Sequence, residues 1–418
     1  MLKKNIGWGS LVAILVVWAG SGEQASGQQR GNADDSVAEL VSRLDLERYK
    51  ATIKGLTAFG DRRQGTRRNR GAVDWIEAEL EAMGCVTERL FYTYDPEPRA
   101  RSRGEGGRPA PLNPSQATPT GGRIGRNGRG PGGSSIFGYR RRTGVVRDPM
   151  AQPDEVLRAI NSEEPTDGER SEVYCTTVGT THPDEMYIVG AHMDGHGFGE
   201  AANDDASGTA IVIELARIFN AADVRTARSI RFALWNNEET GLNGSRAYVE
   251  QRREHQGLEV PSGSGSYPEP RWLGMIQHDM MLFDHGAPGS DGVVSRDQRP
   301  EADVNIEFQS NSALVTESRD LAFFFKAASD TYATDYPAMV GPHMTNTDST
   351  PFMDVTPSIS LRENERGMHI GAGWDPHWHQ PTDLYTTFTD DDFRLGLNAA
   401  QTSLAAIAQL VEAEITSR

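Results

Sequence analysis

Residues 187–194 read YIVGAHMD, an apolar strand that runs directly into a His-x-Asp pair. Similar short apolar runs recur along the chain, and stretches with helical spacing of apolar residues lie between them. We expect strands at 173–178, 186–190, 230–235, 272–277 and 358–361, and helices at 207–221, 244–256, 318–333 and 391–416. This alternation predicts an α/β fold, with a mixed, mostly parallel twisted sheet and helices on both of its faces.

The N-terminal part adds two helices and a strand before the composition changes. Apolar residues have helical spacing over 34–56 and 69–83, and 86–94 is typical of a strand. From about 95 to 170 the chain is rich in Arg, Gly and Pro, which predicts a flexible insert. The insert is either a solvated linker, which this composition favours, or a basic arm for an anionic partner or for the protein's own acidic surface. We expect a single domain over 31–418 that this insert interrupts.

The charge balance argues against a nucleic-acid partner. The 418 residues include 42 Lys and Arg against 59 Asp and Glu, a formal net charge of -17. Proteins that bind nucleic acids show a basic footprint instead. The two cysteines, Cys85 and Cys175, are too few for a disulfide framework or a thiolate metal site. The sequence leaves open whether they pair.

The first residues have the pattern of an export signal. Lys3 and Lys4 precede an apolar stretch at 7–20, and small residues follow it. A membrane span needs roughly 20 apolar residues, and this run is shorter. We therefore expect a cleavable signal peptide over 1–27 rather than an uncleaved anchor. The mature protein is then secreted or periplasmic, without a stable membrane anchor.

Acidic and histidine residues collect where the expected strands end, which is where open α/β sheets place their sites. In chain order they are His192, Asp194, Asp204, Asp205, Glu238, Glu239, Asp279, His377 and His379. Each group has an ordinary explanation when taken alone, such as a helix cap at Asp204 or Asp205. Taken together on successive strand ends, they are the nitrogen and oxygen ligands that suit zinc. Asp194 is a natural partner for orienting His192, because ligating histidines usually donate their second N–H.

With these motifs the sequence resembles the M28 zinc peptidases, the group of aminopeptidases with two co-catalytic zinc ions. The matching stretches are VGAHMDG (189–195), AANDDASGTA (201–210), FALWNNEETGLNGSRAY (232–248), IQHDM (276–280), TDSTPF (347–352) and HWHQPTD (377–383). Residues 56–85 also resemble the opening helices of the family, so that the resemblance covers roughly 35–94 and 171–418. It implies a zinc-exopeptidase fold of the phosphorylase/hydrolase-like type.

The resemblance also implies a role for each site residue. It implies two Zn²⁺ per chain, the first held by His192 and Asp279, the second by Glu239 and His379, with Asp204 bridging them. Glu238 would be the general base, and Asp194 would orient His192. The peptide after the bridging Asp is commonly cis in this family, which here is Asp204–Asp205.

One departure from the family pattern concerns the group that polarises the substrate carbonyl. Several relatives carry a Tyr where this chain has Trp378, so the group that polarises the carbonyl stays open, with Tyr332 and Tyr336 as candidates. His377 is close to His379, but the family spacing to the following Asp383 favours His379 as the ligand.

Two further histidines are not expected to bind metal. His196 lies four residues after His192, but the glycines on both sides of it argue against a helical histidine pair. His278, next to Asp279, is expected to pack or to orient its neighbours.

These features predict a secreted, metal-dependent exopeptidase that hydrolyses the N-terminal bond of peptide substrates. A water bridging the two zinc ions would attack, and Glu238 would take its proton. Three alternatives remain open: a glutaminyl-peptide cyclotransferase-like enzyme with one zinc, a carboxypeptidase or dipeptidase on the same scaffold, and a receptor-type binding module without activity. The complete ligand set argues against the last of these.

Overall fold

The computed structural model describes residues 35–95, 145–283, 304–342, 347–363 and 375–416. The expected signal peptide, 1–27, and most of the expected insert lie outside these residues. Nearly all of the described chain belongs to one compact unit, Ser36–Arg418. None of the described helices is both long and apolar enough to cross a membrane.

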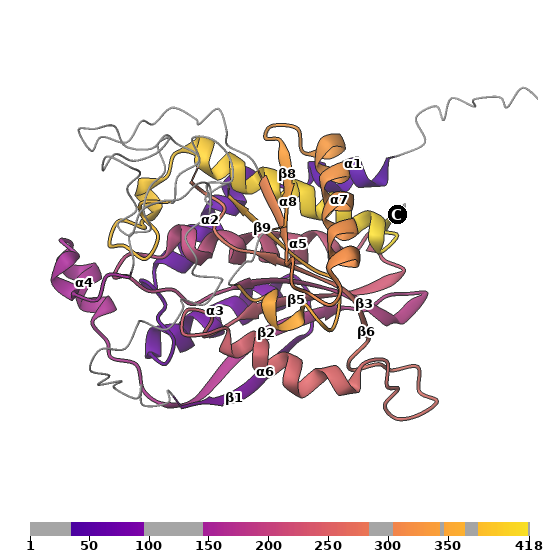
Figure 1. The fold of residues 1–418 in the computed structure, drawn as a ribbon, viewed down its shortest axis with the longest axis horizontal. Coiled ribbons are helices and arrows are strands. Elements are labelled where there is room, and N and C mark those ends of the chain that lie inside the picture. Colours follow the sequence, from indigo (N-terminus) through magenta and orange to yellow (C-terminus); the bar gives the residue numbers. More distant parts are fainter. Residues whose placement is uncertain (1–34, 96–144, 284–303, 343–346, 364–374, 417–418) are drawn as a thin grey trace, which may run out of the picture. The chain divides into compact units, whose positions relative to one another are not determined.

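An eight-stranded mixed sheet forms the centre of this unit (Figure 1). In spatial order its strands are β1 (Thr87–Tyr94), β2 (Gly168–Thr177), β5 (Arg228–Trp235), β3 (His182–His192), β6 (Arg271–His278), β9 (Ser358–Glu363), β7 (Val304–Phe308) and β8 (Ala338–Gly341). The four middle strands, from β5 to β9, run parallel; β2 is antiparallel to β5, and β1 is antiparallel to β2. On the other side β7 is antiparallel to β9 and parallel to β8. A separate two-stranded sheet pairs β4 (Val224–Arg225) with β10 (Glu414–Ile415).

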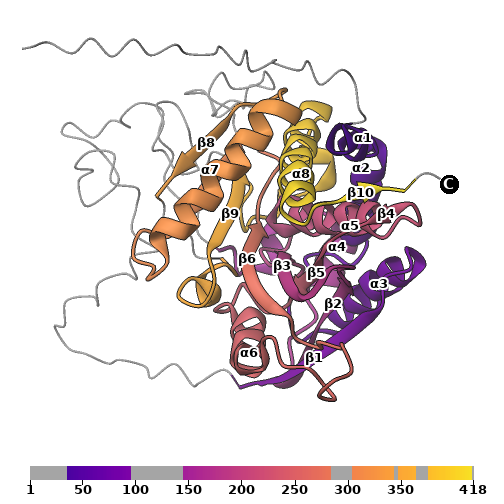
Figure 2. The same cartoon turned by 90° about the vertical axis from the view of Figure 1, so that its right-hand side faces the viewer.

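Helices cover both faces of the sheet (Figure 2). They are α1 (Ser36–Ser42), α2 (Leu46–Thr57), α3 (Arg67–Ala82), α4 (Glu155–Asn161), α5 (Gly208–Phe219), α6 (Asn243–Arg252), α7 (Val315–Tyr332) and α8 (Asp390–Leu410). Successive strand residues point to opposite faces. Val189 and Phe232 therefore pack with α5 and α8, whereas Ile188 and Trp235 pack with Tyr248 of α6. The predicted fold class is confirmed.

Several element boundaries differ from those expected. The helix expected over 34–56 is two helices, because the Asp45 carboxylate accepts the main-chain N–H of Arg48 and begins a second helix there. The last helix ends at Leu410, ahead of β10. Helix α4 and the start of β2 lie within the range assigned to the insert. Strands β7 and β8 were not expected, and they are only five and four residues long.

A disulfide joins Cys85 and Cys175, a pairing that the sequence left open. Cys85 follows α3, and Cys175 lies in β2 opposite Thr87 of β1. The two Cα atoms are 5.8 Å apart, although 90 positions separate the residues in the sequence. The bond therefore fastens α3 to the antiparallel side of the sheet and closes the loop that contains the insert.

Replacing both cysteines should lower the free energy of unfolding by about 2–5 kcal/mol. The main reason is that the unfolded chain regains the conformational freedom of a long loop. Urea unfolding of the wild type and of Cys85→Ala/Cys175→Ala measures the difference. Reduced wild-type protein is the matched control and should unfold at the midpoint of the variant. Equal midpoints for the oxidised wild type and the variant would contradict the prediction.

Candidate metal centre

The predicted site residues lie at one edge of the parallel part of the sheet. Strand β3 ends at His192, β5 at Trp235 and β6 at His278, and these ends are neighbours. The residues that follow them and leave this edge are Asp194, Glu238, Glu239 and Asp279. Asp204 comes from the turn η3 (Ala202–Ser207) before α5, and His379 from the loop before α8. The carboxyl edge of an α/β sheet is the usual place for a site.

Asp204 lies between two histidines that are far apart in the sequence. Its Oδ1 is 3.2 Å from Nε2 of His192, and its Oδ2 is 2.9 Å from Nε2 of His379. Glu239 Oε2 lies 2.8 Å from the same nitrogen of His379, and Asp279 Oδ1 lies 3.7 Å from Nε2 of His192. None of the five side chains is more than 8% exposed. The fold thus gathers the five predicted ligands into two groups that share Asp204.

Asp205 is close to the first of these groups, but its carboxylate oxygens accept hydrogen bonds from the main chain. Its carboxylate accepts the N–H groups of His192, Gly208 and Met280 at 2.8–3.2 Å. The peptide bond between Asp204 and Asp205 is cis, as the resemblance implied. The two neighbouring carboxylates therefore have different surroundings: backbone amides for Asp205 and imidazole rings for Asp204.

Asp194 contacts both His192 and the loop that carries the glutamates. Nδ1 of His192 is 2.9 Å from the main-chain oxygen of Asp194, so the main chain makes the contact that we expected from the carboxylate. The carboxylate instead accepts the main-chain N–H of Glu238 at 2.9 Å. Asp194 therefore ties the end of β3 to the loop after β5.

The two adjacent glutamates differ in their electrostatics. Burial raises the pKa of Glu238 well above its usual range. Burial also acts on Glu239, but the neighbouring His196 and His379 outweigh it and lower the pKa of that carboxyl to about 2. Two carboxyl groups whose surroundings shift their pKa values apart are suited to different tasks: one can carry a proton while the other stays ionised.

The donor set fits a divalent metal. Oδ1 of Asp279 and Oε1 of Glu239 are buried and have no hydrogen-bond partner among the described residues. Burying an ionised oxygen without a partner is costly, and a cation beside it would offset that cost. Imidazole and carboxylate ligands without thiolate are those of zinc, with cobalt or manganese as chemically related ions.

A comparison with known families gives an independent result. The model of peptidase family M28 matches residues 172–398, which is more than half of the chain. The chain belongs to peptidase family M28. Over 75 residues it is 40% identical to aminopeptidase YwaD of Bacillus subtilis, a match that covers 18% of this chain and 16% of that relative. The first curated relatives are thus matched over less than a fifth of their own length.

Solved structures with the same fold include an aminopeptidase and a glutaminyl cyclase. The aminopeptidase from Aneurinibacillus sp. strain AM-1 has a TM-score of 0.56 at 18% identity, over 89% of this chain and 95% of that one. The glutaminyl cyclase of Porphyromonas gingivalis has a TM-score of 0.52 at 13% identity, over 88% of this chain and 99% of that one. At these identities the likeness shows a shared fold.

The M28 resemblance also drew attention to His377 as a possible ligand and to Trp378 and Tyr336 for the carbonyl-polarising role, and each of these has different surroundings. Nδ1 of His377 is 2.9 Å from Oγ1 of Thr382, whereas the ring of Trp378 stacks on that of His379 with centroids 3.6 Å apart. The Tyr336 hydroxyl donates to the main-chain oxygen of Asp391, which directs it into α8.

His278 and Tyr332 contribute to packing. His278 Nε2 contacts Oγ of Ser403, and burial lowers the pKa of this histidine to about 4. Both observations agree with the packing role expected for it. Tyr332, the other tyrosine considered for the carbonyl-polarising role, packs against the main apolar core.

Sequence reasoning missed two sets of residues near this centre. His196 forms no helical pair with His192, as expected, yet its loop brings it beside His379. Asn69 of α3 and Asn236 exchange two side-chain amide hydrogen bonds, both 3.0 Å long. Because Asn236 is two residues before Glu238, this pair anchors the glutamate loop to α3. A scan for polar residues on the buried face of 69–83 would have singled out Asn69.

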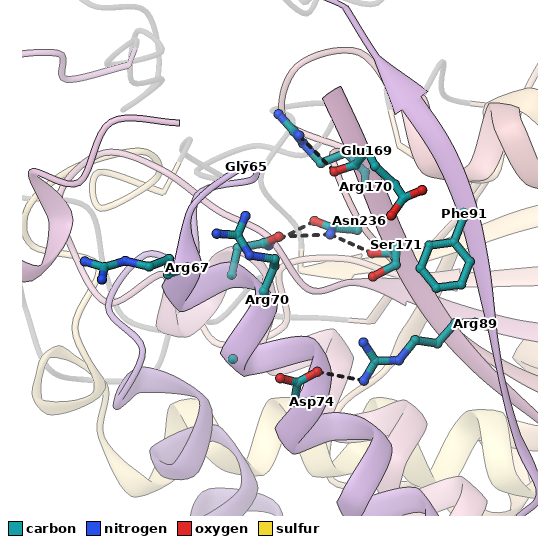
Figure 3. A pocket seen from close by; sticks show the side chains of 12 residues that line it. Gly65, Arg67, Arg70, Asp74, Arg89, Phe91, Glu169, Arg170, Ser171 and Asn236 are labelled. Carbon is teal, nitrogen blue, oxygen red and sulfur yellow. Dashed lines mark hydrogen bonds and ion pairs between the residues drawn. The ribbon is translucent and has the colours of Figure 1, made fainter. Parts of the chain in front are cut away.

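A cavity of about 440 Å³ borders the same asparagine pair (Figure 3). Its lining includes four arginines: Arg67 and Arg70 of α3, Arg89 of β1 and Arg170 of β2. Arg89 is paired with Asp74 and Glu77, and Arg170 donates to Gln64 and to main-chain oxygens. The predicted metal ligands are not among the residues that line this cavity.

Zinc binding to the metal-free protein should release protons near neutral pH. Burial lowers the pKa of His379, but Glu239 and Asp204 outweigh it and raise that pKa to about 9. An imidazole with the ordinary histidine pKa is neutral above about pH 6.5. In the folded chain this imidazole keeps its proton up to about pH 9, and a metal that binds there must displace it. Calorimetric titration with zinc in buffers of different ionisation enthalpy measures the release. It should diminish as the pH rises toward 9, and a binding enthalpy that is the same in every buffer at pH 7.5 would contradict the assignment.

Proposed function

We propose that the chain is a secreted zinc aminopeptidase with two metal ions, formed as a single domain over 31–418. The observation that carries this proposal is the position of Asp204, whose two carboxylate oxygens face two different buried histidines. Membership of peptidase family M28 and the aminopeptidases among its relatives support it. The proposed ligands of the two metals are His192, Asp279 and Asp204 for one, and Glu239, His379 and Asp204 for the other.

Bound zinc would lower the pKa of a water molecule and polarise the scissile carbonyl. The protein's own part is then to hold the peptide and to move a proton. We assign the general base to Glu238, because burial raises its pKa and its neighbour Glu239 stays ionised. Its carboxylate takes the proton of the attacking water and passes it to the leaving amine. Asp194 holds this loop in place through the main-chain N–H of Glu238.

Export from the cytoplasm is the second part of the proposal. It is supported by the basic, apolar and small-residue pattern over 1–27 and by the Cys85–Cys175 disulfide. Disulfides form and persist in oxidising compartments and are rare in the cytosol. A protein recovered only from the cytosol, with both thiols free, would contradict this part.

A glutaminyl cyclase is the second candidate, because two glutaminyl cyclases share the fold. The two candidates differ in chemistry. A peptidase releases the N-terminal residue as a free amino acid, whereas a cyclase leaves the peptide intact with a cyclised N-terminus. The gathering of two imidazoles and two further carboxylates around the bridging Asp204 favours two metals and therefore the peptidase.

A panel of peptides distinguishes these possibilities. One sequence is offered with a free N-terminus, with an acetylated N-terminus, with an amidated C-terminus, and with Gln in first position. An aminopeptidase cleaves the first and third at similar rates and spares the acetylated form. Full-rate cleavage of the acetylated peptide would exclude it, loss of cleavage on C-terminal amidation would indicate a carboxypeptidase, and ammonia release from the Gln peptide would indicate a cyclase.

Glu238→Gln should keep both metals and lose turnover. The amide has nearly the same shape but cannot take a proton, and general base catalysis contributes about 10²–10⁴-fold. Elemental analysis should give two zinc ions per chain for variant and wild type, while kcat falls by that factor. Glu254→Gln, at an exposed position, is the matched control and should behave as wild type. Wild-type turnover by Glu238→Gln would refute the base assignment.

A further inference from the structure

A third histidine, His196, lies beside the proposed centre and is not one of its proposed ligands. Its Nε2 is 3.3 Å from Nδ1 of His379 and 3.2 Å from Oε2 of Glu239. The rings of His196 and His379 meet edge to face, with centroids 4.2 Å apart and planes at 87°. One imidazole thus contacts both residues proposed to hold the second metal together with Asp204.

The backbone around His196 fixes this contact. Gly197 has a φ of +105°, and a Cβ at this position would lie 2.3 Å from the carbonyl carbon of His379. The two chain segments therefore touch backbone to backbone, which only glycine permits here. The next residue, Phe198, donates its N–H to the Asp61 carboxylate at 3.2 Å and accepts from Gln152 at 2.7 Å. The loop is held from both sides, so the pairing of the rings follows from the fold.

We propose that His196 is a positioning residue for one metal, acting through His379. A histidine that binds metal through Nε2 carries its proton on Nδ1, and the acceptor of that proton fixes the tautomer and the ring orientation. Among the described residues, Nε2 of His196 lies within hydrogen-bond distance of His379 Nδ1, and it accepts that proton when His196 is neutral and a bound cation, in place of a charged His196, compensates Glu239. At the other metal the main-chain oxygen of Asp194 occupies the same position next to His192 Nδ1, at 2.9 Å.

The inference rests on the proposed function, since it takes Glu239 and His379 as ligands. It predicts an effect on only one of the two metals. Within the described part of the chain, the hydrogen-bond, ion-pair and ring contacts of His196 are to these two residues and not to His192 or Asp279. Loss of the imidazole should therefore weaken one of the two metals and leave the other unchanged. Removing such an outer partner of a ligand typically costs 10–100-fold in metal affinity, so about that factor is expected.

The experiment compares His196→Leu with His196→Gln, both stripped of metal and then titrated with zinc against a competing chelator. The glutamine side chain can present its amide oxygen as an acceptor for His379, whereas leucine cannot. We expect His196→Leu to lose about 10–100-fold in one affinity only, and His196→Gln to recover most of it. His255→Leu, at an exposed position of η4 (Arg253–His255), is the control and should match the wild type. The visible absorption of cobalt-loaded protein should change for one cobalt equivalent and not for the other.

Different outcomes separate the two proposals. If the wild type binds two zinc ions and His196→Leu binds both with unchanged affinity, the role of His196 is refuted and the proposed function stands. Parallel weakening of both metals with a lower melting temperature, or failure of glutamine to restore affinity, would also refute a positioning role. If the wild type binds no zinc, the proposed function itself fails, and the inference falls with it.

Discussion

Buried negative charge is the constraint on which the rest of the site depends. Asp194, Asp204, Glu238, Glu239 and Asp279 are all buried side chains at one edge of the sheet. Two like charges 4 Å apart repel by about 4 kcal/mol at an effective dielectric constant near 20. A protein can tolerate such a cluster by protonating some members, by surrounding others with donors, or by binding a cation. The surroundings of each carboxylate show which of these solutions applies to it.

The carboxylates fall into two classes. Burial raises the pKa of Asp194 to about 6 and that of Glu238 well above its usual range, so these groups can accept protons. Despite burial, neighbouring cations and hydrogen bonds lower the pKa of Asp204, Glu239 and Asp279. Those three are the carboxylates that face imidazole rings. Such a division, with some carboxyl groups that accept protons and others that stay ionised, suits a metal-assisted hydrolysis.

The sequence brought out the proposed ligands more completely than the residues that hold them in place. Strand ends placed His192, Glu239 and Asp279 at one edge, because alternation of strand and helix fixes where strand ends meet. Asp204 and His379 lie instead in the turn η3 and in the loop before α8, so the sequence motifs predicted them and the expected strand ends did not. The contact of His196 was not predicted, because periodicity compares only residues that are close in the sequence. This contact with His379 depends on the close approach of two backbone segments at Gly197, which no spacing rule shows. Strands β7 and β8 are too short to give a pattern, and their pairing comes from their neighbours in the sheet. The pairing of Cys85 with Cys175 likewise needed the register of β1 on β2.

The two proposed metal positions differ in the group that contacts Nδ1 of their histidine. At His192 the partner of Nδ1 is a main-chain oxygen, which every residue type at position 194 would supply. The Asp194 side chain is thereby left to accept the main-chain N–H of Glu238, so it supports the loop of the proposed base rather than the imidazole. At His379 the partner is a side chain, which substitution can remove. The first position is therefore built into the strand end, while the second depends on the identity of one loop residue, and differences in metal affinity or metal choice among related sequences should arise at the second.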